Sequence, residues 1–212
     1  ISRKIDKLDL TAGSFYEQFG SGIIMRSYEA RPLGIDQGIQ GIRLKYQLSD
    51  NWRIKAFTGR QKNRLETYKP VLKGLELSGY VKVNDKLKLS PGFGVVNRTI
   101  DTETMNNIAQ EINGYVLADR FTPKYNVYAG SVYNTLYAGK FTWYSEYAYK
   151  TEDAIRNLDG LLLTPTLGNV IYNTLTYSKK GFGISVLYKY TENFDMRVHP
   201  NALGNFGTTN FL

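Results

Sequence analysis

The sequence contains no cysteine and only one histidine, His199. The absence of cysteine excludes disulfides, thiolate zinc sites and cysteine nucleophiles. A metal site needs several converging ligands, and one histidine among scattered carboxylates offers no such spacing. His199 lies in a proline-containing turn at 196–201, without a nucleophile motif around it. We therefore predict no catalytic residue, no metal site and no cofactor, and a protein that is not an enzyme.

Long apolar runs are also missing. A membrane-spanning helix needs roughly 20 consecutive apolar residues, and no run in this chain approaches that length. The mean hydropathy is −0.36, which is unexceptional for a soluble protein. Helical membrane spans are excluded, but membrane-spanning strands are not, because a β-barrel turns only every second side chain towards lipid.

Negative charge is in the minority, since the formal net charge is +8. A basic balance often indicates a nucleic-acid partner. Here the lysines and arginines are spread along strand-like segments instead of gathering in one patch or helix. We therefore expect no nucleic-acid partner.

The dominant signal in the chain is the alternation of apolar and polar residues that is typical of strands. In the segment 41–48, Ile42, Leu44, Tyr46 and Leu48 alternate with Arg43, Lys45 and Gln47. A polar turn at 49–51 follows, and alternation resumes over 52–58. Two alternating segments joined by a short polar turn predict a β-hairpin.

The same pattern recurs along the chain, in roughly nine or ten segments of about 8–13 residues, close to the length of a tilted membrane strand. Only 102–112 has helical composition, and 152–163 is a second long connection. The predicted fold is all-β: an antiparallel up-and-down transmembrane β-barrel, part of a larger barrel, with one short helical loop. We expect residues 1–212 to form a single β-barrel region and to be a piece of a longer chain.

Two details favour a barrel. The tetrapeptide Y-N-T-L occurs at 133–136 and again at 172–175, as expected if similar hairpins are added side by side. Tyrosines also lie near many predicted strand ends, where an aromatic belt at the membrane boundary would place them. These are Tyr46, Tyr68, Tyr115, Tyr125, Tyr137, Tyr177 and Tyr190.

The segment 10–29, which contains F-Y-E-Q-F-G-S-G-I, is the most distinctive part of the chain. It resembles the signature of an uncharacterised family of Bacteroidota outer-membrane β-barrel proteins, defined as a domain of unknown function. The likeness continues through R-P-L-G-I-D at 31–36 and G-I-R-L-K-Y at 41–46, and returns at 201–205. The resemblance implies a location in the bacterial outer membrane and a barrel architecture; it implies no activity.

Three glycines within this region, Gly13, Gly20 and Gly22, are candidates for a structural bend. Glycine lets a strand bulge and lets one backbone approach another closely. A phosphate-binding loop is the rival interpretation, but it needs a lysine and a hydroxyl after the last glycine. Ile23 and Ile24 stand there instead.

The basic residues Arg43, Lys45, Arg53 and Lys55 share the polar face of the predicted hairpin. A charge facing lipid costs roughly 2–4 kcal/mol at the midplane, so in a barrel this face must line the lumen or lie at the rim. Two interpretations remain open. The basic face is either a solvated polar wall balanced by acidic residues, or part of an anion-selective channel.

The sequence thus predicts a non-enzymatic integral outer-membrane protein, acting as a channel or as a structural, partner-binding component of an envelope complex. Its expected partners are outer-membrane lipid and lipopolysaccharide, with other envelope proteins as further candidates. The alternative is a soluble, secreted β-sandwich that binds carbohydrate through exposed aromatic residues. In a sandwich the aromatics would cluster on loops or on one sheet face.

Overall fold

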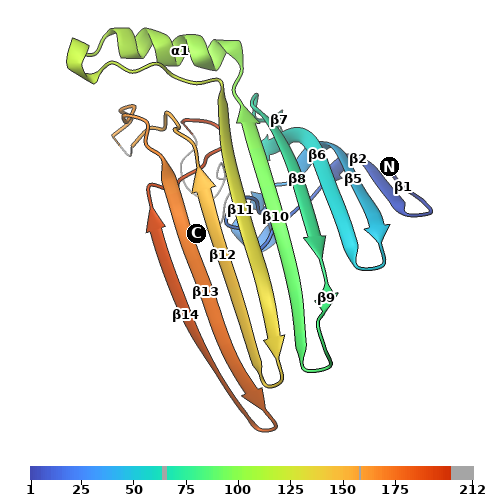
Figure 1. Ribbon diagram of the computed structural model, residues 1–212. Helices are drawn as coiled ribbons and strands as arrows, with labels where there is room; N and C mark the ends of the chain where they lie inside the picture. The colour runs from blue at the N-terminus through green and yellow to red at the C-terminus, as the bar shows by residue number, and fades with distance from the viewer. Residues whose placement is uncertain (64–65, 158, 202–212) are drawn as a thin grey trace.

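The computed structural model describes residues 1–63, 66–157 and 159–201. Its main feature is one 12-stranded antiparallel sheet (Figure 1). The strands that follow one another across the sheet are β1 (Ser2–Ile5), β2 (Leu8–Phe15), β5 (Ile39–Ser49), β6 (Trp52–Asn63), β8 (Val71–Gly79), β10 (Leu87–Thr99), β11 (Asn126–Ala138), β12 (Phe141–Lys150), β13 (Gly168–Lys179) and β14 (Phe182–Glu192). The short strands β7 (Glu66–Thr67) and β9 (Val81–Lys82) pair with β6 and β10.

Each strand on this path pairs with the strand before it on the path, and the path follows chain order, so the sheet is an up-and-down meander. Tight turns join the strands at one end, and the long connections lie at the other (Figure 1). The hairpin predicted around 49–51 is confirmed as the β5–β6 pair. The antiparallel all-β prediction is therefore confirmed.

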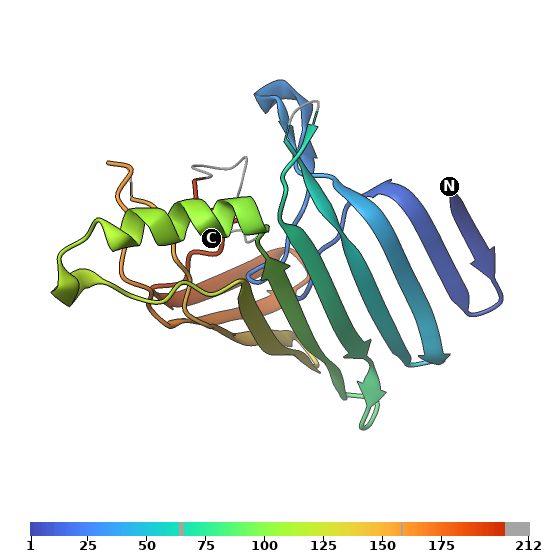
Figure 2. The same cartoon turned by 90° about the horizontal axis from the view of Figure 1, so that it is seen from above.

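The sheet is bent into an open arc (Figure 2). Its edges are β1 and β14, and neither pairs with a further strand among the described residues. Within the described residues the sheet is therefore curved but not closed. It is also a single layer apart from the small ribbon β3 (Glu29–Ala30) with β4 (Ile35–Asp36). The β-sandwich alternative is wrong, because no second large sheet packs against the first within the described chain.

The two faces of the sheet differ as the alternation predicts. On β12, Trp143 and Tyr147 are 46% and 47% exposed, whereas the intervening Glu146 is 1% exposed. The exposed apolar side chains lie on the convex face, and the polar and small ones on the concave face. The tyrosine belt is only partly present. Tyr137 lies on the concave face, and Tyr68, Tyr115 and Tyr125 lie outside the strands.

The predicted helical loop is confirmed as α1 (Thr102–Asn113), which lies over the long-loop end of the sheet (Figures 1 and 2). Asp101 caps it by accepting a hydrogen bond from the Thr104 backbone N–H. Met105, Ile108 and Ile112 form its buried stripe and pack with Leu162 of the next long connection. Two single-turn 3-10 helices, Arg31–Leu33 and Leu117–Asp119, complete the helical structure in the described residues. None of these helices has the length and apolarity to span a membrane.

Candidate functional site on the concave face

The chain between β2 and β3 folds onto the concave face of the sheet. We call residues 17–27 of this connection the inward segment. It forms a tight loop closed by two backbone hydrogen bonds, from Phe19 N to Met25 O at 3.0 Å and from Ser27 N to Glu17 O at 2.9 Å. The loop reverses at Gly20 and Gly22, whose φ values of 52° and 101° favour glycine.

Apolar side chains hold the inward segment against the sheet. Phe19, Ile24 and Met25 are at most 1% exposed and pack against concave-face residues of the long-loop half of the strands. Phe194 and Met196, from the connection after β14, join the same cluster. The concave face therefore has an apolar half beneath the loops and a polar half towards the tight turns.

Gly20 and Gly22 lie outside the strands, at the tip of this loop, whereas Gly13 lies within β2 at a φ of 123°. A side chain at Gly20 would meet both Glu146 and Tyr133, because a Cβ there would lie 2.9 Å from an atom of each. The glycine therefore allows the loop tip to reach the sheet. Of the aromatic residues near Gly20 in the family signature, Phe19 is buried in the core, whereas Tyr16 is 40% exposed.

Two glutamates from well-separated strands hold the loop tip. Glu76 on β8 accepts a hydrogen bond from Gly20 N at 3.1 Å, and Glu146 on β12 accepts one from Ser21 N at 3.0 Å. Glu76 also accepts a hydrogen bond from the Tyr133 hydroxyl at 2.6 Å. The Y-N-T-L repeat explains part of this arrangement, since Tyr133 and Tyr172 are the cross-strand neighbours of Glu146 on either side.

The four basic residues predicted to share one face do lie on the concave face, but they are not equivalent. Lys55 is nearly buried and contacts Glu17 at 2.9 Å and Glu76 at 2.6 Å. Arg43 and Lys45 each lie 3.7 Å from the other Glu17 oxygen. Glu17, which the sequence analysis did not single out, thus places one negative charge among three positive ones from its position in the inward segment. The acidic partner of these basic residues thus comes from a loop, and strand alternation alone could not predict it.

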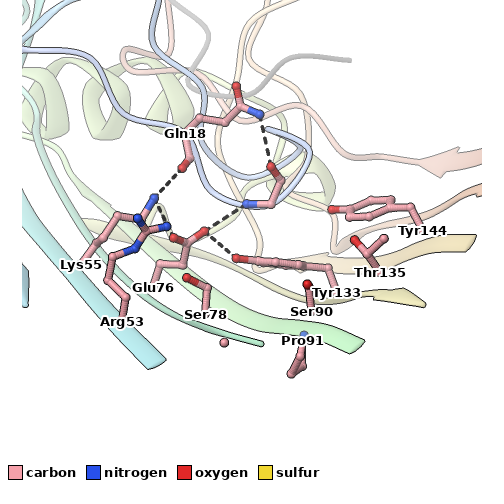
Figure 3. Close-up of a pocket in the computed structure, with 12 residues that line it drawn as sticks. Gln18, Arg53, Lys55, Glu76, Ser78, Ser90, Pro91, Tyr133, Thr135 and Tyr144 are labelled. Carbon is pink, nitrogen blue, oxygen red and sulfur yellow. Dashed lines mark hydrogen bonds and ion pairs between the residues drawn. The ribbon is translucent and has the colours of Figure 1, made fainter. Parts of the chain in front are cut away.

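Arg53 is the fourth basic residue, and it lies beyond this cluster, towards the tight turns. It lines a hollow of about 400 Å³ below the inward segment, which is shown in Figure 3. The residues around the hollow are Gln18, Gly20, Arg53, Lys55, Glu76, Ser78, Gly79, Ser90, Pro91, Tyr133, Thr135 and Tyr144. The hollow is the candidate functional site of the described chain.

His199 lies away from this hollow, at the long-loop end. Its Nε2 is 3.2 Å from the Thr104 hydroxyl, and its Nδ1 accepts a hydrogen bond from Asn201 N at 3.2 Å. The Thr104 hydroxyl donates to Asp101, so it is not free to act as a nucleophile activated by the histidine. Burial lowers the pKa of His199. Within the described residues, no three histidine, cysteine, aspartate or glutamate side chains converge as a metal site requires.

A solved structure shares this architecture. The structure of OccK8 (OprE) from Pseudomonas aeruginosa, an outer-membrane β-barrel, superposes with a TM-score of 0.50 at 10% sequence identity. The match covers 90% of this chain but 49% of OccK8, so the chain spans about half the length of that protein. The likeness shows a shared antiparallel all-β fold, and in this chain the described sheet is open at both edges.

The chain belongs to a family of unknown function, DUF6029, whose family model matches residues 1–212. The family resemblance read from the sequence is confirmed to that extent, and a Bacteroidota origin stays a prediction. Among curated proteins, none matches this sequence.

Proposed function

We propose that this chain forms part of the wall of an integral bacterial outer-membrane β-barrel, and that the barrel is a passive channel for small polar solutes, not an enzyme. The concave face would line the lumen and the convex face would contact lipid. This extends the fold, which the comparison with OccK8 supports, to a location and an activity.

The observation that carries the proposal is a row of side chains on the convex face. Cross-strand pairing links one residue from each strand of the path from β2 to β14. The row runs Leu8, Tyr46, Ile54, Leu77, Phe93, Val132, Tyr147, Ile171 and Tyr190. It contains no charge. A continuous apolar band of this kind, open to the surroundings, is what a lipid-facing barrel wall presents.

The adjacent row on the concave face has the opposite character. It runs Asp9, Lys45, Lys55, Glu76, Gly94, Ser131, Ala148, Val170 and Thr191. Charged and small residues replace the apolar ones, although the two rows are one residue apart on every strand. Water on the concave side and lipid on the convex side account for both rows together.

The structure also favours one of the two interpretations of the basic face. Arg43, Lys45 and Lys55 are paired with Glu17, and Lys55 also with Glu76, so most of the basic face is an ion-paired polar wall with three positive and two negative charges. Selectivity for anions would therefore have to come from basic residues that have no acidic partner, such as Arg53.

Cell fractionation of the full-length protein tests the location. We expect it in the outer-membrane fraction, with different gel migration before and after boiling. A protein that stays soluble without detergent and shows no heat shift would overturn the barrel. Conductance in planar bilayers tests the channel. A barrel that inserts but conducts nothing would leave a structural or partner-binding role in the envelope.

A further inference from the structure

The hollow below the inward segment contains polar groups that the fold does not use. Five adjacent strands supply its wall, β6, β8, β10, β11 and β12, and Gln18 of the inward segment lies over it (Figure 3). Its volume of about 400 Å³ lies within the range of small-molecule sites. What could bind there depends on which of its polar groups are already engaged.

The carboxylate of the hollow is fully engaged. One Glu76 oxygen accepts hydrogen bonds from Gly20 N and the Tyr133 hydroxyl, and the other lies 2.6 Å from Lys55 Nζ. Lys55 in turn donates to Glu17 and to the Gln18 carbonyl, each at 2.9 Å. These groups hold the inward segment and have little left to offer a ligand.

Arg53 has no such engagement. No hydrogen bond or ion pair joins its guanidinium to any residue that the structure describes. Its side chain projects from β6 into the same space as Lys55 and Glu76 (Figure 3). The charged residues lining the hollow are two basic and one acidic, so a single positive charge remains, and the unpaired group is Arg53.

Three hydroxyls beside it are also unused. Ser78 is the direct cross-strand partner of Arg53, and Ser90 pairs with Thr135 on the neighbouring strands. All three line the hollow, and none is hydrogen-bonded to another side chain or backbone group in the described part of the chain. One unpaired guanidinium thus faces a short stretch of unpaired hydroxyls.

We propose that this hollow binds a small polyol that carries one oxyanion group. The guanidinium of Arg53 would take the oxyanion, because its planar fork of N–H donors matches carboxylate and phosphate oxygens. The hydroxyls of Ser78, Ser90 and Thr135 would exchange hydrogen bonds with the hydroxyls of the polyol. The inference rests on the proposed function, in which the concave face is a water-filled lumen.

Two neighbouring hollows give such a solute a route to the tight-turn end of the barrel. One, of about 330 Å³, shares Arg53, Ser78 and Gly79 with the site and reaches Asp50 and Asn51. The other, of about 500 Å³, shares Ser90 and is lined by Lys86 and Lys88. Asp85 also lines the second hollow but pairs with Lys82, and no carboxylate in the described chain pairs with Lys86 or Lys88, so two unpaired lysines lie on this side of the route.

Calorimetric titration of the full-length protein in detergent tests the site with gluconate, glucose 6-phosphate and neutral glucose as probes. We expect at least one of the two anions to bind about tenfold or more tightly than glucose. Which anion binds distinguishes a carboxylate from a phosphate ligand. Glucose binding as tightly as both anions, or no binding of either anion, would overturn the proposal.

The substitution Arg53→Gln should weaken anion binding by about tenfold or more, and Arg53→Lys by less, since lysine keeps the charge but loses the fork. Arg60→Gln is the matched control, because Arg60 lies on the same strand but on the opposite face. Unchanged affinity in Arg53→Gln, with heat-shifted migration intact, would overturn the site. Because migration and membrane location are measured separately, failure of the site is distinguishable from failure of the barrel.

Discussion

Glu146 on β12 holds Ser21 of the inward segment through a single carboxylate oxygen. This oxygen accepts hydrogen bonds from the Ser21 N–H at 3.0 Å and from the Ser21 hydroxyl at 2.6 Å, across 125 positions of sequence. The Tyr144 hydroxyl donates to the same oxygen at 2.5 Å, and the other carboxylate oxygen is buried without a partner among the described residues. Glu146 therefore attaches the loop tip to β12, while Glu76 attaches it to β8.

Replacing Glu146 by Gln should loosen the inward segment. Hydrogen bonds to a charged group contribute about 1.5–3 kcal/mol each, and a neutral amide accepts more weakly. Arg26 lies within the segment, so its release should expose a trypsin site there. We expect faster cleavage after Arg26 in the folded, detergent-solubilised variant than in the parent protein.

The neighbouring Ser145→Ala is the control for this experiment, because Ser145 lies on the convex face and contacts no part of the inward segment. Equal cleavage rates for Glu146→Gln and the parent would show that Glu146 does not hold the segment.

The buried ion pair between Arg98 and Asp153 should be the most sensitive polar contact to single substitution. The two side chains are 1% and 0% exposed, with Nη2 and Oδ1 2.5 Å apart, and Arg98 also donates to the Arg197 carbonyl at 2.7 Å. Removing one partner of a buried pair leaves a charge uncompensated and costs about 3–5 kcal/mol.

We expect Arg98→Ala to lower the free energy of unfolding by about that amount, ~3–5 kcal/mol, in urea titrations of protein refolded into vesicles. The double variant Arg98→Met with Asp153→Leu leaves no orphaned charge and should be clearly more stable than Arg98→Ala. A double variant as unstable as the single one would indicate that shape, not charge, dominates at this position.

Gly92 on β10 should not tolerate a side chain. A Cβ there would lie 2.2 Å from an atom of the Tyr133 ring. Gly130→Ala, on the paired strand, is the matched control, because its Cβ would meet nothing nearer than 3.6 Å. We expect Gly92→Ala to reduce the free energy of unfolding by roughly 1–3 kcal/mol, and Gly130→Ala to change it little. Equal stability of the two variants would contradict the packing described for Tyr133.

His199 should titrate below its ordinary pKa of 6.5, because burial disfavours the charged ring. It is the only histidine in the sequence, so its imidazole resonances in a ¹³C-histidine NMR titration are unambiguous. Above the unfolded pKa, both folded and unfolded states are neutral. As the pH falls from about 6.5 towards the lower folded pKa, the unfolded state binds the proton first, so stability is lost over that window.

The substitution Asp101→Asn sharpens this test. Asp101 carries the one negative charge that raises the pKa of His199, so its removal should lower that pKa further. Asparagine remains a good helix cap, which keeps α1 in place. A midpoint at or above 6.5 in the parent protein would contradict the burial of the ring.

A charged side chain on the convex face should destabilise the protein in a membrane. Val132 lies in the uncharged row of β11 and is 52% exposed. If lipid covers it, Val132→Lys should cost roughly 2–4 kcal/mol near the bilayer midplane, whereas Thr135→Lys, on the concave face of the same strand, should cost much less. Refolding yield in vesicles, read from heat-shifted migration, compares the two. A smaller loss of refolding yield for Val132→Lys than for Thr135→Lys would contradict the assignment of the convex face to lipid.

The strand content, the alternation and the meander were all readable from the sequence, because each depends on neighbours within one hairpin. The period of two that separates Trp143 and Tyr147 from Glu146 decides which face each residue takes in any strand. The helix was readable for the same reason, since the helical composition of 102–112 is a local property. The family signature at 15–23 was equally visible, and the family resemblance was confirmed by the family model that matches residues 1–212.

The candidate site was not readable in this way. The sequence placed Arg43, Lys45, Arg53 and Lys55 on one face, but it could not show that a loop would return to pair three of them with Glu17. Nor could it show that Glu76 and Glu146, from strands far apart in the chain, would converge on Gly20 and Ser21. These contacts depend on how far the sheet curves and on where the inward segment enters it, and both are set by long-range packing.

The sequence by itself thus determined an antiparallel sheet with an apolar and a polar face, because a two-residue period is a property of each strand alone. Only the tertiary structure decided that the polar face is divided between an ion-paired cluster and a hollow with one unpaired guanidinium. Charge balance depends on distance in space, and the residues that neutralise or spare each cation come from elements far apart in the chain.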